Sequence, residues 1–153
     1  MKRFEFRFQS VAKVRKIEME RQARVLAEAQ MKVKEIEAQI EALKQKNEDE
    51  VSRLRELAIR GQIPRQMMEL SVMYRDQIKR DFKRRLIELR EAEAKVREER
   101  ENLIEKEKAR KVMEKVKERD FETYAEERRR LESKTIDEIA CRADAGPGIQ
   151  FES

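Results

Sequence analysis

Apolar residues recur every seven positions along this chain, and this period limits the folds that it can adopt. In the first half, one series with a spacing of seven contains Met19, Leu26, Val33, Ile40 and Leu54. A companion series three positions later contains Ala29, Ile36, Leu43 and Leu57. Asn47 and Glu50 interrupt the two series. Two apolar positions per heptad are typical of a helix that pairs with another helix along a narrow seam.

The second half repeats the pattern, with one irregularity. Its series with a spacing of seven contains Phe82, Leu89, Val96 and Leu103. The companion positions are Ile78 and Ala92. After Leu103 the register slips, and the stripe is expected to continue less regularly through Met113, Val116, Tyr124 and Leu131. Such slips alter the supercoil locally without ending the helix.

One segment, "IRGQIPRQ" at 59–66, separates the two halves. Gly61 can end a helix in a left-handed conformation, and Pro64 disfavours helix at the residue before it. A short helix–helix link favours antiparallel neighbours. We therefore predict an all-α fold, a long antiparallel two-helix coiled coil or α-helical hairpin. The expected single domain covers 1–145, with arms at about 4–59 and 66–143, a turn at about 60–65 and a flexible tail at 146–153.

Composition agrees with long solvated helices. Of 153 residues, 46% are charged, with 38 basic against 33 acidic side chains and a net charge of +5. The chain has no Trp and no His, and it is rich in helix formers. Without His, and with Cys141 as the single cysteine, neither a His/Cys metal site nor a nucleophile with a His base is available. We therefore expect no enzyme activity, no metal and no cofactor.

The basic clusters and the short apolar runs bear on nucleic-acid binding and on membrane insertion. "KRDFKRR" at 79–85 and "ERRRLE" at 127–132 are positive runs with acidic neighbours, a pattern typical of a solvated helix face. Nucleic-acid binding favours more net charge and interleaved aromatic residues, so no nucleic acid is expected. No apolar run approaches the ~18 residues of a transmembrane helix, so no membrane insertion is expected.

Phe4, Phe6 and Phe8 alternate at the start of the chain. A helix cannot place all three on one stripe, because residues two apart point to different sides. Either the first turn is extended, or some of these rings are exposed for a partner. Packing against the C-terminal arm is the alternative to partner binding.

Both ends of the chain resemble one family. "FEFRFQSVAKVRKIEMERQARVLAEAQ" at 4–30 is similar to the start of FliJ proteins of the bacterial flagellar export apparatus. "RKVMEKVKERDFETYAEERRRLESKTIDEIACRA" at 110–143 is similar to their C-terminal arm. The positions that carry this second match best are Lys134, Asp137, Glu138, Ile139 and Ala140. The resemblance covers nearly the whole chain, including the single central break.

The resemblance implies a function and partners. FliJ proteins are two-helix antiparallel coiled coils, similar to the central stalk of rotary ATP synthases. They associate with the hexameric export ATPase and its regulator, contact the cytoplasmic domain of the membrane export gate, and assist chaperones that deliver substrates. The chain is thus expected to be a non-enzymatic coupling rod in flagellum biogenesis and type III protein export. It is expected in the cytoplasm, peripheral to the cytoplasmic face of the inner membrane.

The resemblance also implies binding residues. Contact with the export gate maps to the turn-proximal half, at Gln39, Leu43, Tyr74 and Ile78. Leu43 and Ile78 fit the seam, so core packing competes with binding there, whereas Tyr74 is an amphipathic aromatic suited to anchoring a partner. For the ATPase, the expected contacts are Phe4, Phe6, Phe8, Lys134, Asp137 and Glu138.

Three functions remain open on sequence alone. The favoured function is the flagellar coupling rod, with its counterpart in virulence secretion as a close alternative. A nucleic-acid-associated coiled coil would use the basic runs and bind with steep salt dependence. A generic scaffold would need neither an ATPase nor a nucleic acid.

Overall fold

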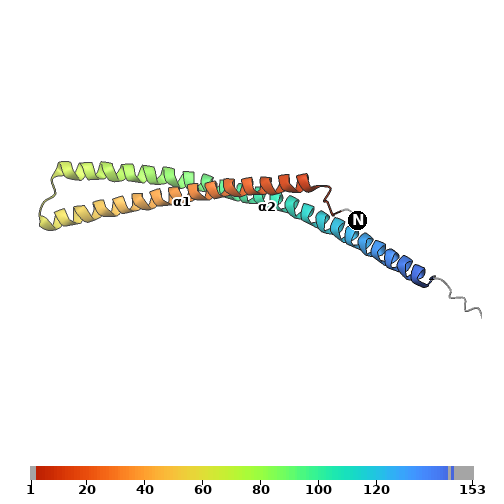
Figure 1. The fold of residues 1–153 in the computed structure, drawn as a ribbon. Coiled ribbons are helices and arrows are strands. Elements are labelled where there is room, and N and C mark those ends of the chain that lie inside the picture. The colour runs from red at the N-terminus through yellow and green to blue at the C-terminus, as the bar shows by residue number, and fades with distance from the viewer. Residues whose placement is uncertain (1–2, 145, 147–153) are drawn as a thin grey trace, which may run out of the picture. The chain divides into compact units, whose positions relative to one another are not determined.

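Two long helices account for the fold. The computed structural model describes residues 3–144 and 146, and its elements are α1 (Gln9–Arg60) and α2 (Arg65–Asp144) (Figure 1). Strands are absent from these described residues. The prediction of an all-α helical hairpin is therefore confirmed. The predicted flexible tail at 146–153 lies, apart from Gly146, outside the described residues.

The start of α1 differs from the prediction. The helix begins at Gln9 rather than at about Phe4, because the alternating phenylalanines occupy a non-helical segment. The backbone N–H of Ala12 donates to the carbonyl of Phe8 at 2.9 Å, so Phe8 supplies the first helical acceptor. Gln9 N–H closes a turn on the carbonyl of Phe6 at 3.1 Å. Residues 4–8 are therefore non-helical, as one of the two alternatives required, and Phe8 is also 40% exposed, as the other required.

The turn lies where the sequence placed it. Gly61 has a φ of 147°, a conformation that L side chains rarely adopt, and it ends α1 directly after Arg60. Pro64 precedes α2, and its carbonyl accepts a hydrogen bond from the N–H of Met68 at 3.1 Å. Proline has no backbone N–H, but an N–H at the start of a helix has no acceptor within the helix. Pro64 therefore costs α2 no hydrogen bond.

The described chain forms two compact units, which are treated separately below. The first comprises residues 19–106 and is named the hairpin body. The second combines residues 1–18 with 107–153, so far as these are described, and is named the terminal unit.

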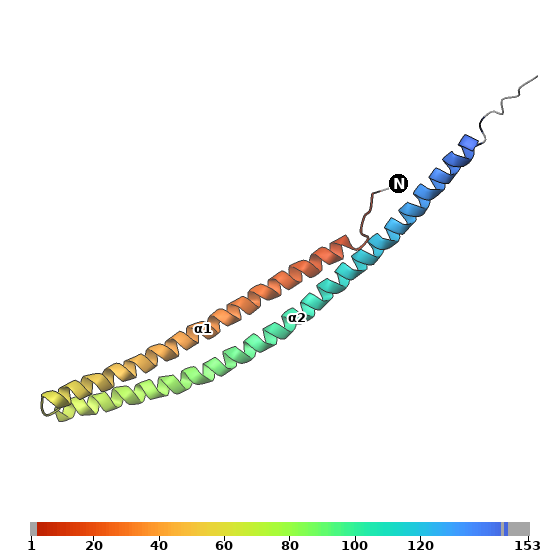
Figure 2. The ribbon, with the colours of Figure 1, turned by 90° about the horizontal axis from the view of Figure 1, so that it is seen from below.

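Within the hairpin body the helices run antiparallel. Cross-helix contacts join Gln22 to Glu99 and Glu50 to Ser71, so advancing 28 residues along α1 moves the contact back by 28 along α2. Figure 2 shows this opposite course, with the yellow end of α1 beside the yellow-green start of α2. Ile36, Ile40 and Ile78 are buried between the helices, at positions that the heptad pattern predicted for the seam. This confirms the coiled-coil interpretation.

In the terminal unit the predicted stripe ends early. Met113, Val116 and Tyr124 are half-buried, as expected for seam residues. Leu131 is 51% exposed, and the side chains from 126 to 144 are all exposed. Placing Leu131 in the seam was therefore wrong, because Leu131 lies beyond Phe121 and Tyr124, the residues of α2 on which the ring of Phe4 packs.

Candidate partner-binding surfaces

Two of the residues expected at an export-gate surface line a groove of the hairpin body. Leu43 of α1 and Ile78 of α2 border a groove of about 300 Å³, together with Phe82. Ile78 is buried and Leu43 half-buried, so both side chains hold the two helices together.

Tyr74 has a different setting. It is 46% exposed on α2, and Leu70 and Met73 beside it are each 67% exposed. Residues separated by three and four positions share one face of a helix, so these three side chains form a continuous apolar face. We name it the Tyr74 face. The sequence analysis identified Tyr74 but not Leu70 and Met73. Their short spacing from Tyr74 on one helix could have indicated that they lie beside it.

Gln39 lines neither the groove nor the Tyr74 face. It is half-buried, and its Oε1 atom is buried without a hydrogen-bond partner among the described residues. An unsatisfied buried amide oxygen costs stability, and Gln39 is therefore a position where an incoming donor would be favourable. The structure thus brings Leu43 and Ile78 together in the groove. Gln39 and Tyr74 each lie one helical turn away, on the same helices as Leu43 and Ile78, and do not line it.

A polar layer crosses the seam near the turn. Glu50 is buried, and its carboxylate accepts hydrogen bonds from Arg53 at 2.7 and 2.9 Å and from the hydroxyl of Ser71 across the seam. The hydrogen bonds from Arg53 and then Ser71 lower the pKa of Glu50 from 4.5 to about 2, against the opposing effect of burial. Three residues earlier on α1, the side-chain oxygen of Asn47 accepts a hydrogen bond from Arg75 of α2 at 3.2 Å.

A second polar layer lies farther along the hairpin body. Glu99 of α2 is buried, and Gln22 of α1 donates to its carboxylate and, at 3.1 Å, to its backbone carbonyl. Lys95 forms an ion pair with the same carboxylate at 2.7 Å. The hydrogen bonds from Lys95 and Gln22 lower the pKa of Glu99. Each buried glutamate is thus stabilised as a carboxylate by a basic neighbour on its own helix and by a hydrogen-bond donor on the facing helix. The second of these contacts forms only when the two helices pair.

Aromatic rings cluster in the terminal unit. The ring of Phe4 lies 5.3 Å from that of Phe121, nearly perpendicular to it, and 5.4 Å from that of Tyr124. Phe6 is buried and lies 6.0 Å from Phe8, which is 40% exposed. Packing against the C-terminal arm, the alternative to partner binding, is therefore realised for Phe4. Of the three, Phe8 offers the most ring surface to a partner.

The last turns of α2 present the other residues expected at an ATPase surface. Lys134, Asp137 and Glu138 are all exposed, as are Ile136 and Ile139 on the same segment. The free cysteine, Cys141, is exposed there as well. This segment has accessible charged and apolar side chains, and nothing in it encloses a reacting group.

Several basic side chains of the two basic runs form ion pairs with acids. Arg84 binds Asp81 at 2.9 Å, Arg85 binds Glu88 at 2.5 Å, and Arg128 binds Glu132 at 3.1 Å. These pairs lie three or four residues apart on one helix, as expected for a solvated helix face. Among the residues described, no group of three or more Cys, Asp or Glu side chains is placed to hold a metal ion. No described helix combines the length and apolarity needed to cross a membrane.

Comparison with known proteins identifies a family for nearly the whole chain. The sequence model of the family described as "Flagellar FliJ protein" matches residues 4–146. Neither the curated proteins nor the solved structures include a match to this chain. The family match spans both helices, the turn and the aromatic N-terminal segment.

Proposed function

This chain belongs to the flagellar FliJ protein family, and we propose that it couples the export ATPase to the export gate without catalysing a reaction itself. Family membership makes it a component of the flagellar export apparatus. The finer role, a stalk-like coiled coil that also assists chaperones and their substrates, is the part that we propose. The partners in this proposal are the ATPase hexamer and its regulator, the cytoplasmic domain of the gate, and substrate chaperones.

The observation that carries the proposal is the Tyr74 face. Tyr74, Leu70 and Met73 expose a contiguous apolar surface on a helix that is otherwise dominated by charge. Tyrosine is among the residues that contribute most binding energy at protein interfaces, because it combines a large apolar ring with a polar hydroxyl. The face lies in the turn-proximal part of the hairpin body, and the contact with the gate that the family resemblance implies is expected in this part too.

The ATPase contact is proposed for the terminal unit. Phe8 and the exposed segment with Lys134, Asp137 and Glu138 supply its accessible side chains. By analogy with a rotary stalk, we expect the end that carries the chain termini to engage the ATPase ring. The two partners would then use different units of the chain.

Substituting Tyr74→Ala tests the assignment. We expect roughly tenfold weaker binding to the purified cytoplasmic domain of the gate, with stimulation of the purified ATPase unchanged. Val72→Ala is the matched control, because Val72 is also exposed and lies on the same turn of α2 but outside the Tyr74 face. Removing residues 1–8 should have the reverse effect and reduce ATPase stimulation alone. Loss of both interactions in either variant, with helicity intact by circular dichroism, would refute the division of labour.

A further inference from the structure

Methionines are concentrated in and beside the Tyr74 face. Three of the seven methionines of the chain, Met67, Met68 and Met73, lie within seven residues near the start of α2. The hairpin body contains no cysteine and no tryptophan, since the single cysteine is Cys141 and the chain has no Trp. Its methionine thioethers are therefore the groups that two-electron oxidants such as peroxides attack most readily.

The three methionines differ in their access to solvent. Met73 is 67% exposed and Met68 is 44% exposed, whereas Met67 is half-buried. An oxidant must reach the sulfur atom from solvent, so we expect Met73 to react first of the three. Met73 is also the one that belongs to the Tyr74 face.

The acidic residues beside Met73 form ion pairs along α2. Glu69, four residues before Met73, pairs with Arg65 at 3.0 Å. Asp76, three residues after Met73, pairs with Lys79 at 3.8 Å. In both pairs the basic partner lies farther from Met73 along the helix than the acid does, so neither pair spans the thioether. The sulfur atom of Met73 is therefore accessible to an oxidant.

Oxidation of Met73 changes the polarity of the Tyr74 face. A lone pair on the sulfur attacks one oxygen of hydrogen peroxide, an S–O bond forms and the O–O bond breaks. The proton on the attacked oxygen passes to the departing hydroxide, which leaves as water. The sulfur loses two electrons and the peroxide gains them. The product, methionine sulfoxide, is polar, so one of the three side chains of the face is no longer apolar.

We propose that oxidation of Met73 to its sulfoxide is a reversible switch, which weakens binding at the Tyr74 face while the hairpin stays folded. The inference rests on the proposed function, in which this face contacts the gate. Sulfoxide formation disrupts interfaces that use methionine as an apolar contact. Because Met73 is exposed rather than in the seam, water can hydrate the sulfoxide and the pairing of the helices is unaffected.

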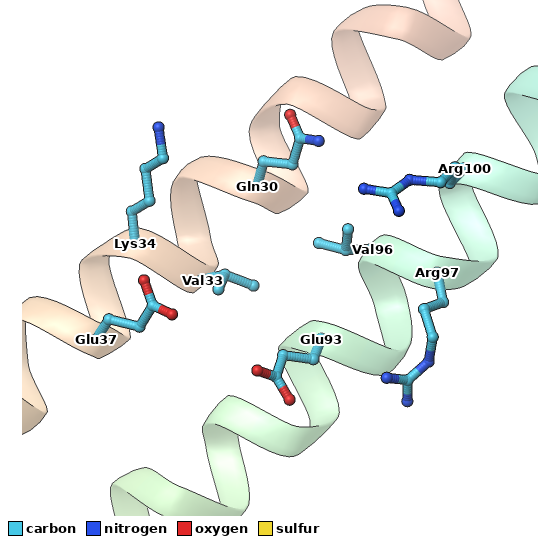
Figure 3. A pocket seen from close by; sticks show the side chains of 8 residues that line it. All are labelled: Gln30, Val33, Lys34, Glu37, Glu93, Val96, Arg97 and Arg100. Atoms are coloured by element: carbon cyan, nitrogen blue, oxygen red, sulfur yellow. The ribbon is translucent and has the colours of Figure 1, made fainter.

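Met31 on α1 supplies a matched control. It is 71% exposed, slightly more than Met73. The residues three and four positions away from it are small or charged, namely Ala27, Glu28, Lys34 and Glu35. The cavity between the helices at this level, of about 580 Å³, is lined by eight side chains, and none of them is a methionine (Figure 3). Oxidation of Met31 therefore alters neither an apolar face nor this cavity.

Limited treatment with hydrogen peroxide tests the chemical step. Cys141→Ala is introduced into every form of the chain, so that the exposed thiol does not react. Mass spectrometry of proteolytic peptides then gives the sulfoxide fraction at each methionine over time. We expect sulfoxide to form at Met73 roughly threefold or more faster than at Met67, with helicity unchanged by circular dichroism.

Binding to the purified cytoplasmic domain of the gate tests the regulatory step. Each form is measured before and after treatment, and the ratio of its two affinities is compared. The chain with all its methionines should bind roughly fivefold more weakly after oxidation, and Met31→Leu should show the same loss. Met73→Leu should have the same affinity before and after treatment. Methionine sulfoxide reductases A and B, which act on the two sulfoxide epimers, should restore binding of the oxidised chain.

Equal loss of affinity in Met73→Leu and Met31→Leu would overturn the proposal, as would loss of helicity on oxidation or reaction at Met67 as fast as at Met73. Binding that Tyr74→Ala weakens but oxidation of Met73 does not would refute the switch and leave the proposed function intact. Binding that Tyr74→Ala does not weaken would refute the proposed function, and the switch with it.

Discussion

At the scale of single residues, the buried carboxylate of Glu50 shows how a charged side chain can belong to a coiled-coil core. Glu50 occupies a seam position and would be costly there if it were unpaired. Its hydrogen bonds to Arg53 and Ser71 satisfy the carboxylate and hold its pKa at about 2. Ser71 on the facing helix is buried too, and it is small enough to leave room for the glutamate.

Replacing Glu50 by Gln tests this account through pH. The folded-state pKa of about 2 lies below the ordinary 4.5, so the ionised form stabilises the fold above pH 4.5. That contribution is lost as pH falls from about 4.5 to about 2, because the unfolded chain takes up the proton first. At pH 7 we expect Glu50→Gln to lower the free energy of unfolding by about 1–3 kcal/mol, and the difference should shrink in acid.

Urea unfolding of both proteins at several pH values would measure this difference. Glu48→Gln, at an exposed position two residues away, is the control and should remain close to the unmodified chain. A difference for Glu50→Gln that stayed constant down to pH 2 would show that the ionised carboxylate is not the source of the stability.

At the scale of the helices, the period of the apolar residues predicted which faces of the two helices pair, but not the register in which they pair. The seam positions Ile36, Ile40 and Ile78 are buried as the heptads require, and the turn at Gly61 and Pro64 follows from local chemistry. The burial of these positions and the place of the turn both depend on local properties of the sequence, which can be recognised without the structure. The seam therefore offers a direct stability test.

Ile40→Asp should destabilise the hairpin by about 3–5 kcal/mol, because it removes a buried apolar side chain and places a charge between the helices. Lys44→Asp lies on the same helix one turn later, at a side chain that is 54% exposed. Its cost should remain below about 1 kcal/mol. Thermal unfolding followed by circular dichroism compares the two, and equal melting temperatures would mean that the assigned seam is incorrect.

Other features of the helices could not be predicted, for physical reasons. Glu50 and Asn47 read as interruptions of the seam, because the partners Ser71 and Arg75 are identified only once the pairing register is known. Leu70 and Met73 resemble core residues until the register turns them outward. The helical start at Phe4 was wrong because tertiary packing of its ring on Phe121 and Tyr124 competes with local helix propensity.

At the scale of the whole molecule, the two polar layers fix how the halves of the chain pair within the hairpin body. Gln22 and Glu50 are 28 residues apart on α1, and Ser71 and Glu99 are 28 apart on α2. Since 28 residues are four heptads, both layers are satisfied in one register. A slip of one heptad, about 10 Å, would place both glutamates opposite the wrong residues.

Deleting one heptad from α1, residues 30–36, should therefore lower the melting temperature strongly, because the two layers can no longer form together. Deleting residues 85–91 from α2 should have a similar effect. These segments face each other in the observed register, so deleting both should restore most of the lost stability. Circular dichroism melts of the three variants provide the measurement, and a double deletion no more stable than either single one would refute a shared register.

The equal spacing of the two polar layers also bears on how such a chain can change length over generations. A single inserted or deleted heptad between the layers would break one polar contact, and natural selection would tend to remove it. A compensating change on the opposite helix would remove the penalty. Relatives that share these layers should therefore differ in length here by multiples of seven, with gaps that occur in pairs, one before the turn and one after it.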